Sequence, residues 1–260
     1  MKILATDYDG TLNHGGIDKE KCDAINEWQK NGNLFGIVSG RSLRGLKMLT
    51  SGIENPKNLV KTEKTQSYKC DYLIANNGAV ICDGELNVLS QTKCEPDIII
   101  PLVKALFELN CPLACICGST FEDTYIKPDK EHCAEDEFTL DNMPAIPFFN
   151  QISTILETDE EAAEVVRVLK ERFSDRLNPL QNGRCIDIVP KGVDKASGIY
   201  ALLDTIGAKK EDVITVGDNI NDADMIREFY SYAMENGVDE IKKLANKTTI
   251  SVTELINNEL

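Results

Sequence analysis

The fold is decided by the N-terminal stretch Lys2-Ile3-Leu4-Ala5-Thr6-Asp7-Tyr8-Asp9-Gly10-Thr11-Leu12, an apolar run that breaks into two acids, a glycine and a threonine. The apolar run predicts a buried strand, and residues two apart on a strand point to the same side. Asp7 and Asp9 therefore leave the end of this strand with converging carboxylates, which repel each other unless a cation lies between them. A divalent ion such as Mg2+ prefers oxygen ligands and suits that position, and Gly10 allows the sharp turn. The alternative is an ordinary acidic turn after a buried strand.

Two more apolar runs, 34–38 and 72–75, predict further buried strands, and small polar residues follow each of them. Ser39-Gly40-Arg41 comes after the first run and Asn76-Asn77-Gly78 after the second. Intervening segments such as 18–31 carry the apolar spacing of helices. This alternation predicts a parallel sheet wrapped by helices on both faces, in which ligands bind at the carboxyl ends of the strands.

The alternation is interrupted near residue 84, where Asp83-Gly84-Glu85-Leu86 predicts a hairpin turn. Beyond it the chain has the mixed helix and strand pattern of a separate α+β unit, and strand–helix alternation resumes near 190. We therefore expect a Rossmann-like core made of 1–84 and 190–260, with 85–189 inserted as an α+β domain.

Composition restricts the classes of function. The 260 residues include 28 basic and 43 acidic ones, a net charge of −15, which argues against non-specific binding of nucleic acid or of an anionic membrane. No run approaches the roughly 18 apolar residues of a membrane span, and Met1 leads directly into a strand. These features are typical of a cytoplasmic enzyme or binding protein, and they do not indicate an oligomeric state.

Nine cysteines are scattered without paired spacing, which is typical of reduced thiols. One local group, Cys111, Cys115 and Cys117 with His132-Cys133 downstream, is a candidate zinc site. However, Cys115 and Cys117 lie in an apolar run near 113–117 that predicts a buried strand, so we favour a structural role for them.

The predicted strand ends and one helix start bring together two acids at Asp7 and Asp9, a hydroxyl at Ser39, a lysine at 191 or 195, and two more acids at Asp218 and Asp222. Acids can hold Mg2+, the hydroxyl and backbone amides can bind phosphate oxygens, and the ammonium can neutralise charge on a transferred phosphoryl group. The pattern therefore indicates a site for a cation and a phosphate.

This set of motifs resembles the haloacid dehalogenase superfamily of phosphatases, and within it the Cof-like sugar-phosphatase group with a type IIB cap. The resemblance covers essentially the whole chain and is carried by Asp7-Tyr8-Asp9-Gly10-Thr11, Ser39-Gly40-Arg41, Asn77-Gly78-Ala79 and Gly217-Asp218-Asn219-Ile220-Asn221-Asp222. The family also has a catalytic lysine at a helix start, a place that matches Lys195, whereas Lys191 lies in the preceding turn.

The resemblance implies a Mg2+-dependent phosphatase that hydrolyses a small phosphorylated metabolite, such as a sugar phosphate, through an aspartyl-phosphate. It implies that Asp7 is the nucleophile and Asp9 the general acid and base. Mg2+ would be held by Asp7, the backbone carbonyl of Asp9 and Asp218, and Asp222 and Asn221 would either support these ligands from behind or bind the ion as well. Phosphate or substrate would be bound by Ser39, Gly40, Arg41, Asn77, Gly78, Lys195 and Asn221, although a helix-start ion pair is an equally good role for Arg41.

Two other functions use similar residues. A phosphomutase of the same superfamily would return the phosphoryl group to a sugar instead of water. A phospho-accepting receiver domain also clusters acids, a hydroxyl and a lysine at the tips of a sheet. The chain length, the inserted unit and the two acids on the first strand argue against a receiver domain.

Overall fold

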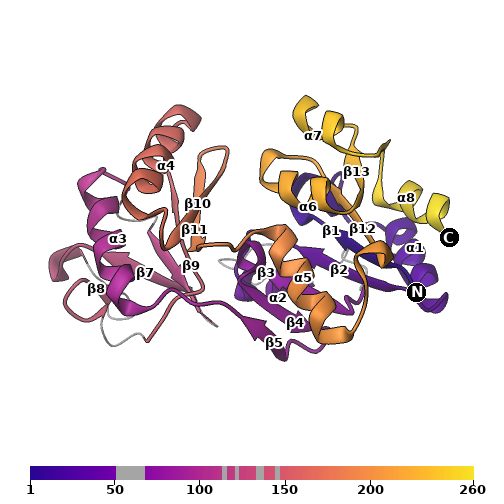
Figure 1. Ribbon diagram of the computed structural model, residues 1–260, viewed down its shortest axis with the longest axis horizontal. Helices are drawn as coiled ribbons and strands as arrows, with labels where there is room; N and C mark the ends of the chain where they lie inside the picture. Colours follow the sequence, from indigo (N-terminus) through magenta and orange to yellow (C-terminus); the bar gives the residue numbers. More distant parts are fainter. Residues whose placement is uncertain (51–67, 113–115, 121–122, 133–137, 144–146) are drawn as a thin grey trace.

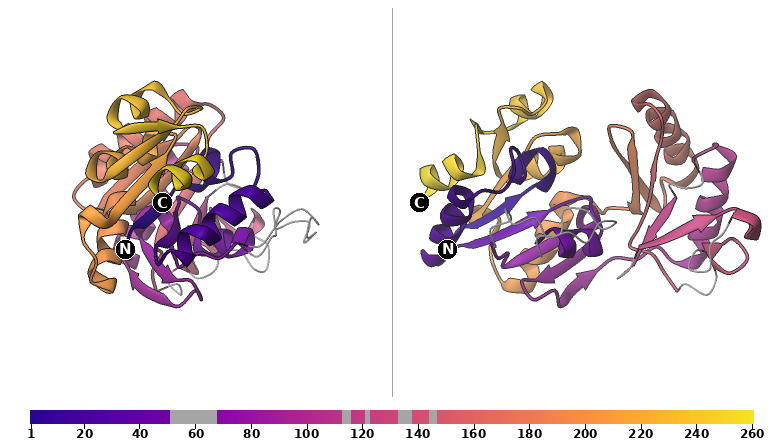
Figure 2. Two further views of the ribbon diagram at one scale, coloured as in Figure 1. Left: turned by 90° about the vertical axis from the view of Figure 1, so that its right-hand side faces the viewer. Right: turned by 180° about the vertical axis from the view of Figure 1, so that it is seen from behind.

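The computed structural model describes residues 1–50, 68–112, 116–120, 123–132, 138–143 and 147–260. These residues form two lobes, each built around its own sheet (Figure 1; Figure 2). Both termini lie in the larger lobe, and the chain passes into the smaller lobe after β5 and returns from it before α5.

The larger sheet runs in the order β14-β13-β12-β1-β2-β3-β4-β5. Its strands are β1 (Ile3–Thr6), β2 (Leu34–Val38), β3 (Tyr72–Ala75), β4 (Val80–Asp83), β5 (Val88–Gln91), β12 (Val213–Gly217), β13 (Tyr230–Met234) and β14 (Lys247–Thr249). The strands from β14 to β3 are parallel, as predicted, but β4 and β5 pair in antiparallel fashion at one edge, so the sheet is mixed.

The chain stays in the larger sheet longer than expected. β5 pairs with β4 through Gln91, so the expected division at residue 84 falls inside a hairpin of this sheet. The physical reason is that Asp83 closes a tight turn, in which its carboxylate accepts hydrogen bonds from the backbone N–H groups of Glu85 and Asn87 at 2.9 Å each. A hairpin of this kind keeps both of its strands in one sheet.

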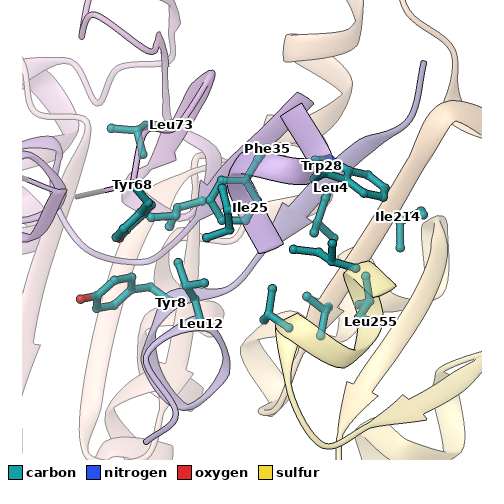
Figure 3. Packing of buried hydrophobic residues seen from close by; sticks show 14 of the residues in the cluster. Leu4, Tyr8, Leu12, Ile25, Trp28, Phe35, Tyr68, Leu73, Ile214 and Leu255 are labelled. Carbon is teal, nitrogen blue, oxygen red and sulfur yellow. The ribbon is translucent and has the colours of Figure 1, made fainter. Parts of the chain in front are cut away.

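Helices cover both faces of the larger sheet. Successive residues of a strand point to opposite faces, so Leu4 packs in one apolar cluster and Ile3 in the other. Figure 3 shows Leu4 among Trp28, Phe35 and Leu255 on the first face. The helices on that face are α1 (Lys19–Lys30), α2 (Leu43–Thr50) and α8 (Val252–Glu259); those on the other are α5 (Lys195–Ile206), α6 (Ala223–Glu228) and α7 (Asp239–Leu244).

The smaller lobe has a largely antiparallel sheet in the order β10-β11-β9-β6-β7-β8. Its strands are β6 (Cys117–Ser119), β7 (Asp123–Lys127), β8 (Phe138–Thr139), β9 (Gln151–Ile155), β10 (Leu177–Asn182) and β11 (Cys185–Pro190), and its helices are α3 (Pro96–Glu108) and α4 (Asp159–Phe173). The strand expected near 113–117 lies partly outside the described residues.

One face of the smaller sheet is apolar and the other is polar. Ile152 and Ile188 face the apolar cluster that includes residues of α3 and α4. Ser153 and Asp187, which alternate with them along β9 and β11, are paired across the two strands and share the opposite face. That polar face is turned toward the larger lobe, because Asp187 accepts a hydrogen bond from Asn77 at 2.9 Å.

Candidate active site

The carboxyl ends of four neighbouring strands place the predicted residues along one edge of the larger sheet. β12, β1, β2 and β3 are adjacent and parallel, and they lead into Asp218, Asp7, Ser39 and Asn76. The backbone N–H of Asn77 donates to the carbonyl of Ser39 at 2.9 Å, which fixes two of these strand ends together. Parallel pairing therefore collects side chains that are far apart in the sequence.

A buried ion-pair triad lies at the centre of this edge. Lys195 Nζ is 2.7 Å from Asp7 Oδ1 and 2.5 Å from Asp222 Oδ1, and these residues are only 1 %, 5 % and 0 % exposed. The other oxygen of Asp222 accepts hydrogen bonds from the backbone N–H groups of Asp218 and Asn219 at 2.9 and 3.0 Å. Asp222 thus fixes both the lysine and the loop after β12.

The start of α5 positions Lys195. Asp194 caps the helix by accepting from the N–H of Ser197 at 2.7 Å, so Lys195 is the first helical residue. Gly78, with φ +104°, packs against this turn: a Cβ atom there would lie 2.1 Å from the carbonyl oxygen of Asp194. Gly78 therefore packs against the start of α5. It is not among the described residues that line the cavity, and its predicted contact with phosphate stays a prediction.

The third acid of the edge, Asp218, is held by Thr11, whose hydroxyl donates to Asp218 Oδ1 at 2.7 Å. Gly10 has a φ of +84° and lies so close to Asp218 that a Cβ atom would stand 2.4 Å from its carboxylate. The glycine thus allows the turn after β1 and the approach of Asp218.

The donor set fits a divalent cation. Carboxylate oxygens of Asp7, Asp218 and Asp222 lie within 4.8 Å of one another. Three carboxylates face one ammonium, and hard cations such as Mg2+ prefer oxygen ligands. Since both oxygens of Asp222 already accept hydrogen bonds, Asp7 and Asp218 are the side chains best placed to hold such an ion.

Burial dominates the electrostatics of the triad. Burial raises the pKa of Asp7 to about 8, against the opposing attraction of Lys195 and with added repulsion from Asp222 and Asp218. Burial alone would lower the pKa of Lys195, but the carboxylates of Asp222 and Asp7 outweigh it and raise that pKa. Burial also raises the pKa of Asp218. The site therefore has more negative charge than it can easily hold without a further cation.

Asp9 forms a separate ion pair at the edge of the site. Arg41 donates through Nε and Nη2 to the two carboxylate oxygens of Asp9 at 2.6 and 2.7 Å. Both side chains are about half exposed, and the guanidinium carbon lies 5.7 Å from the centre of the Tyr8 ring. Arg41 thus takes the ion-pair role that the sequence left open, and it does so beside the predicted nucleophile.

A cavity of about 540 Å3 opens between the two lobes over these residues. Six predicted site residues are in its lining: Asp7, Asp9, Ser39, Gly40, Arg41 and Asn221. Lys195 contacts Asp7, and the carboxylates of Asp218 and Asp222 lie within 4.8 Å of that of Asp7. Asn77 reaches the smaller lobe through its hydrogen bond to Asp187. Lys191, the other candidate lysine, is exposed on the turn before α5.

The sequence did not predict the residues that form the roof of the cavity. We call the lining contributed by the smaller sheet the roof: Cys117, Ser119, Asp123, Gln151, Ser153, Asn182, Cys185 and Asp187. Ser42 and Asn219 of the larger lobe were also missed. The only sequence signal was the alternation of polar and apolar residues in 151–155 and 185–189, which does not say which face covers a site.

The candidate zinc group is only partly described. Cys111 is buried and Cys117 belongs to the roof, whereas Cys115 and Cys133 lie outside the described residues. Among the helices of the described ranges, none has the length and apolar character needed to span a bilayer.

Comparison with known proteins agrees with this geometry. The family model for haloacid dehalogenase-like hydrolases matches residues 4–255. A 5-amino-6-(5-phospho-D-ribitylamino)uracil phosphatase of Bacillus subtilis is 39 % identical over 268 residues, covering 97 % of this chain and 93 % of that protein. An Escherichia coli protein of the same description is 24 % identical over 247 residues, covering 91 % of this chain and 86 % of the relative.

Solved structures share the fold along the whole chain. A haloacid dehalogenase-like hydrolase from B. subtilis superposes with a TM-score of 0.78 at 15 % identity, covering 100 % of both chains. A structure described as a HAD subclass IIB sugar phosphatase gives a TM-score of 0.74 at 20 % identity and covers 100 % of this chain and 99 % of the other.

Proposed function

Because the chain belongs to the haloacid dehalogenase-like hydrolases and is a phosphatase of the Cof-like type, we propose that it hydrolyses a small phosphorylated sugar or polyol through a covalent intermediate on Asp7. One observation carries this proposal. Asp7 lies at the tip of β1 with its carboxylate 2.7 Å from the buried ammonium of Lys195, and it lines the same cavity as Asp9 and Arg41.

In the first step, Asp7 attacks phosphorus while the bond to the leaving-group oxygen breaks. Lys195 holds the Asp7 carboxylate in place and neutralises charge on the phosphoryl group. Ser39 and the backbone at Gly40 donate to the phosphoryl oxygens, and Arg41 supplies a second cation at the mouth of the cavity. The incoming phosphate draws Arg41 away from Asp9, which then takes up a proton from water or from the phosphate monoanion. Asp9 gives that proton to the departing alkoxide.

In the second step, a water molecule attacks the phosphorus of the aspartyl-phosphate and frees Asp7. Asp9, now ionised, accepts the proton of that water, so the two steps return it to its protonated state. Splitting the displacement in this way replaces one difficult reaction by two easier ones.

Asp7, Asp218 and the backbone carbonyl of Asp9 would hold Mg2+, with Asp222 behind them. When bound, the ion offsets negative charge on the phosphoryl group and on the acids around it. The site has three carboxylates, Asp7, Asp218 and Asp222, and one buried ammonium, Lys195, and this excess of negative charge supports the binding of a cation there.

We propose that the smaller lobe is a cap that selects the substrate. The relative at 39 % identity, named for a phosphorylated ribitylamino compound, supports a polyol phosphate as the substrate class. The position of the roof over Asp7 and Asp9 also supports a role for the smaller lobe in selecting the substrate.

The test is phosphate release from a panel of polyol and sugar phosphates, with and without EDTA, for the wild type and for Asp7→Asn. We expect metal-dependent release by the wild type and a loss of several orders of magnitude in the variant. A phosphomutase would instead convert the sugar phosphates to isomers without release of phosphate. Near-native release by Asp7→Asn would remove the assignment of the nucleophile.

A further inference from the structure

The charges that line the cavity are unevenly distributed. Around the phosphoryl site the cations are Arg41 and, behind Asp7, Lys195. Among the described residues that line the cavity, Arg41 is the only basic one. The roof contributes two acids, Asp123 and Asp187, and its remaining lining residues are neutral. Among the residues that the structure describes, the charged side chains that the roof presents to the substrate are therefore all acidic.

The two roof acids are held by neutral donors. Asp187 accepts from the Ser153 hydroxyl at 2.8 Å, from Gln151 at 3.0 Å and from Asn77 at 2.9 Å. Hydroxyl and amide donors orient a carboxylate without cancelling its charge.

Asp123 is held in the same way, by the hydroxyls of Ser119 at 3.2 Å and Ser42 at 3.0 Å. An ionised carboxylate has about four acceptor positions, so both acids retain capacity for donors from a ligand. Each acid receives one of its hydrogen bonds from the larger lobe, through Asn77 or Ser42, so both stand at the junction between the lobes.

The sheet register spaces the two acids. Asp187 is paired with Ser153, and Ser119 is paired with Asp123. β11 and β7 are separated by β9 and β6, which at about 4.8 Å per strand puts the two strands about 14 Å apart. Tyr125 is level with Asp187 and Asp123 lies two residues, about 7 Å, further along β7, so the acids are about 16 Å apart across the roof. They therefore bound the space for a leaving group on two sides.

From this arrangement we infer that the leaving group is a neutral or amine-bearing polyhydroxy compound, whose hydroxyl or amino groups donate to Asp187 and Asp123, and that these two acids reject substrates with a second anionic group. The inference rests on the proposed function and specifies its substrate class. Arg44 is close enough for its positive charge to favour the ionised form of the Cys117 thiol in the roof, but it is not among the described residues that line the cavity.

A matched set of substrates tests this inference. Ribitol 5-phosphate, its 1-amino-1-deoxy analogue and 5-phosphoribonate have the same chain length and differ in charge at the end far from the phosphate. We expect kcat/KM for the carboxylate to be at least about tenfold below that for ribitol 5-phosphate, equivalent to about 1.4 kcal/mol. The amine should be used at least as well as ribitol 5-phosphate, and added salt should reduce the discrimination.

Variants identify the residues responsible. Asp187→Asn and Asp123→Asn keep the shape of each side chain and should bring the ratio between the neutral and anionic substrates closer to one. Glu160→Gln, which removes one charge from the exposed start of α4, should leave that ratio unchanged. If Asp187→Asn does not fold, Asp123→Asn and the salt dependence of the wild type still decide the question.

The outcomes separate the two levels of the account. Release of phosphate with equal kcat/KM for all three substrates, or an unchanged ratio in both roof variants, would overturn the inference and leave the proposed function intact. No release from the three substrates or from an aryl phosphate would overturn the proposed function and this inference with it.

Discussion

Replacement of Lys195 by methionine tests the buried triad. The ammonium is 1 % exposed and lies 2.7 Å from Asp7 and 2.5 Å from Asp222, so its removal leaves two buried carboxylates facing each other. Loss of one member of a buried ion pair typically costs about 3–5 kcal/mol. With a urea m-value near the upper end of its usual range, about 3 kcal/mol/M, the unfolding midpoint should fall by about 1 M or more.

The assay is urea unfolding in EDTA, followed by the fluorescence of Trp28. This residue is the sole tryptophan of the chain and is fully buried in the larger lobe, so its signal reports that lobe. Lys210→Met is the matched control, because Lys210 and Glu228 form a pair in which both side chains are nearly half exposed. An exposed pair contributes about 0–1 kcal/mol.

The pH and metal dependence sharpen this prediction. A buried carboxyl whose folded-state pKa lies above its unfolded value binds more protons when folded, so stability is lost as the pH rises through the folded pKa. Because Lys195 lowers the pKa of Asp7, its removal should raise that pKa further above the wild-type value of about 8, so the stability deficit of Lys195→Met should be larger above about pH 8 than below it. Mg2+ at about 100 times its Kd should restore about 2.7 kcal/mol. A midpoint shift no larger than that of Lys210→Met would show that the ammonium of Lys195 does not stabilise the fold.

Three further predictions follow from the geometry. Asp9→Asn should reduce turnover of polyol phosphates by about 10²–10⁴-fold but spare aryl phosphates with good leaving groups, since these need less acid catalysis. Equal losses of turnover on both kinds of substrate in steady-state kinetics would count against Asp9 as the general acid. Gly78→Ala should lower kcat and the urea midpoint more than Gly16→Ala does, because a Cβ atom at 78 would meet Asp194. At Gly16 φ is +87°, but no atom lies within 4 Å of the added Cβ. Similar effects of the two substitutions would show that close packing on α5 is unimportant. Because the pKa of Asp7 without metal is about 8, Mg2+ must displace a proton from it, so the affinity of the protein for Mg2+ should weaken as the pH falls below about 8. Calorimetry in buffers of different ionisation enthalpy would detect the released proton. A pH-independent affinity would contradict the assignment of Asp7 as a metal ligand.

The sequence was most informative where strands are parallel and buried. Continuous apolar runs before Asp7, Ser39 and Asp218 predicted strands whose ends meet at one edge, and the structure brings those ends together. Lys195 was distinguished from Lys191 by its place at a helix start, which the Asp194 cap explains. These features depend on local pattern and on the rule that parallel strands share one functional edge.

The roof could not be predicted, because it depends on register. In an antiparallel sheet a shift of one residue exchanges the two faces, and no local signal places Asp187 rather than Ile188 over the site. The packing of Gly78 on Asp194 could not be predicted for a related reason: a motif indicates that a glycine is required but not which neighbour comes close to it. The boundary between the lobes lies later in the chain than predicted, because β5 pairs with β4 in the larger sheet. A turn such as that at Asp83 can occur within a domain or at its edge, so its sequence does not locate the boundary.

Identification of a covalent phosphate on Asp7 would show whether this residue is the nucleophile. The wild type would be mixed with a radiolabelled polyol phosphate and Mg2+, quenched with acid during the first turnover, digested and mapped by mass spectrometry. We expect label on the peptide that carries Asp7, and this label should be lost after treatment with alkali and missing from Asp7→Asn. Turnover at the normal rate with no phosphorylated Asp7 at any quench time would contradict the assignment of Asp7 as the nucleophile.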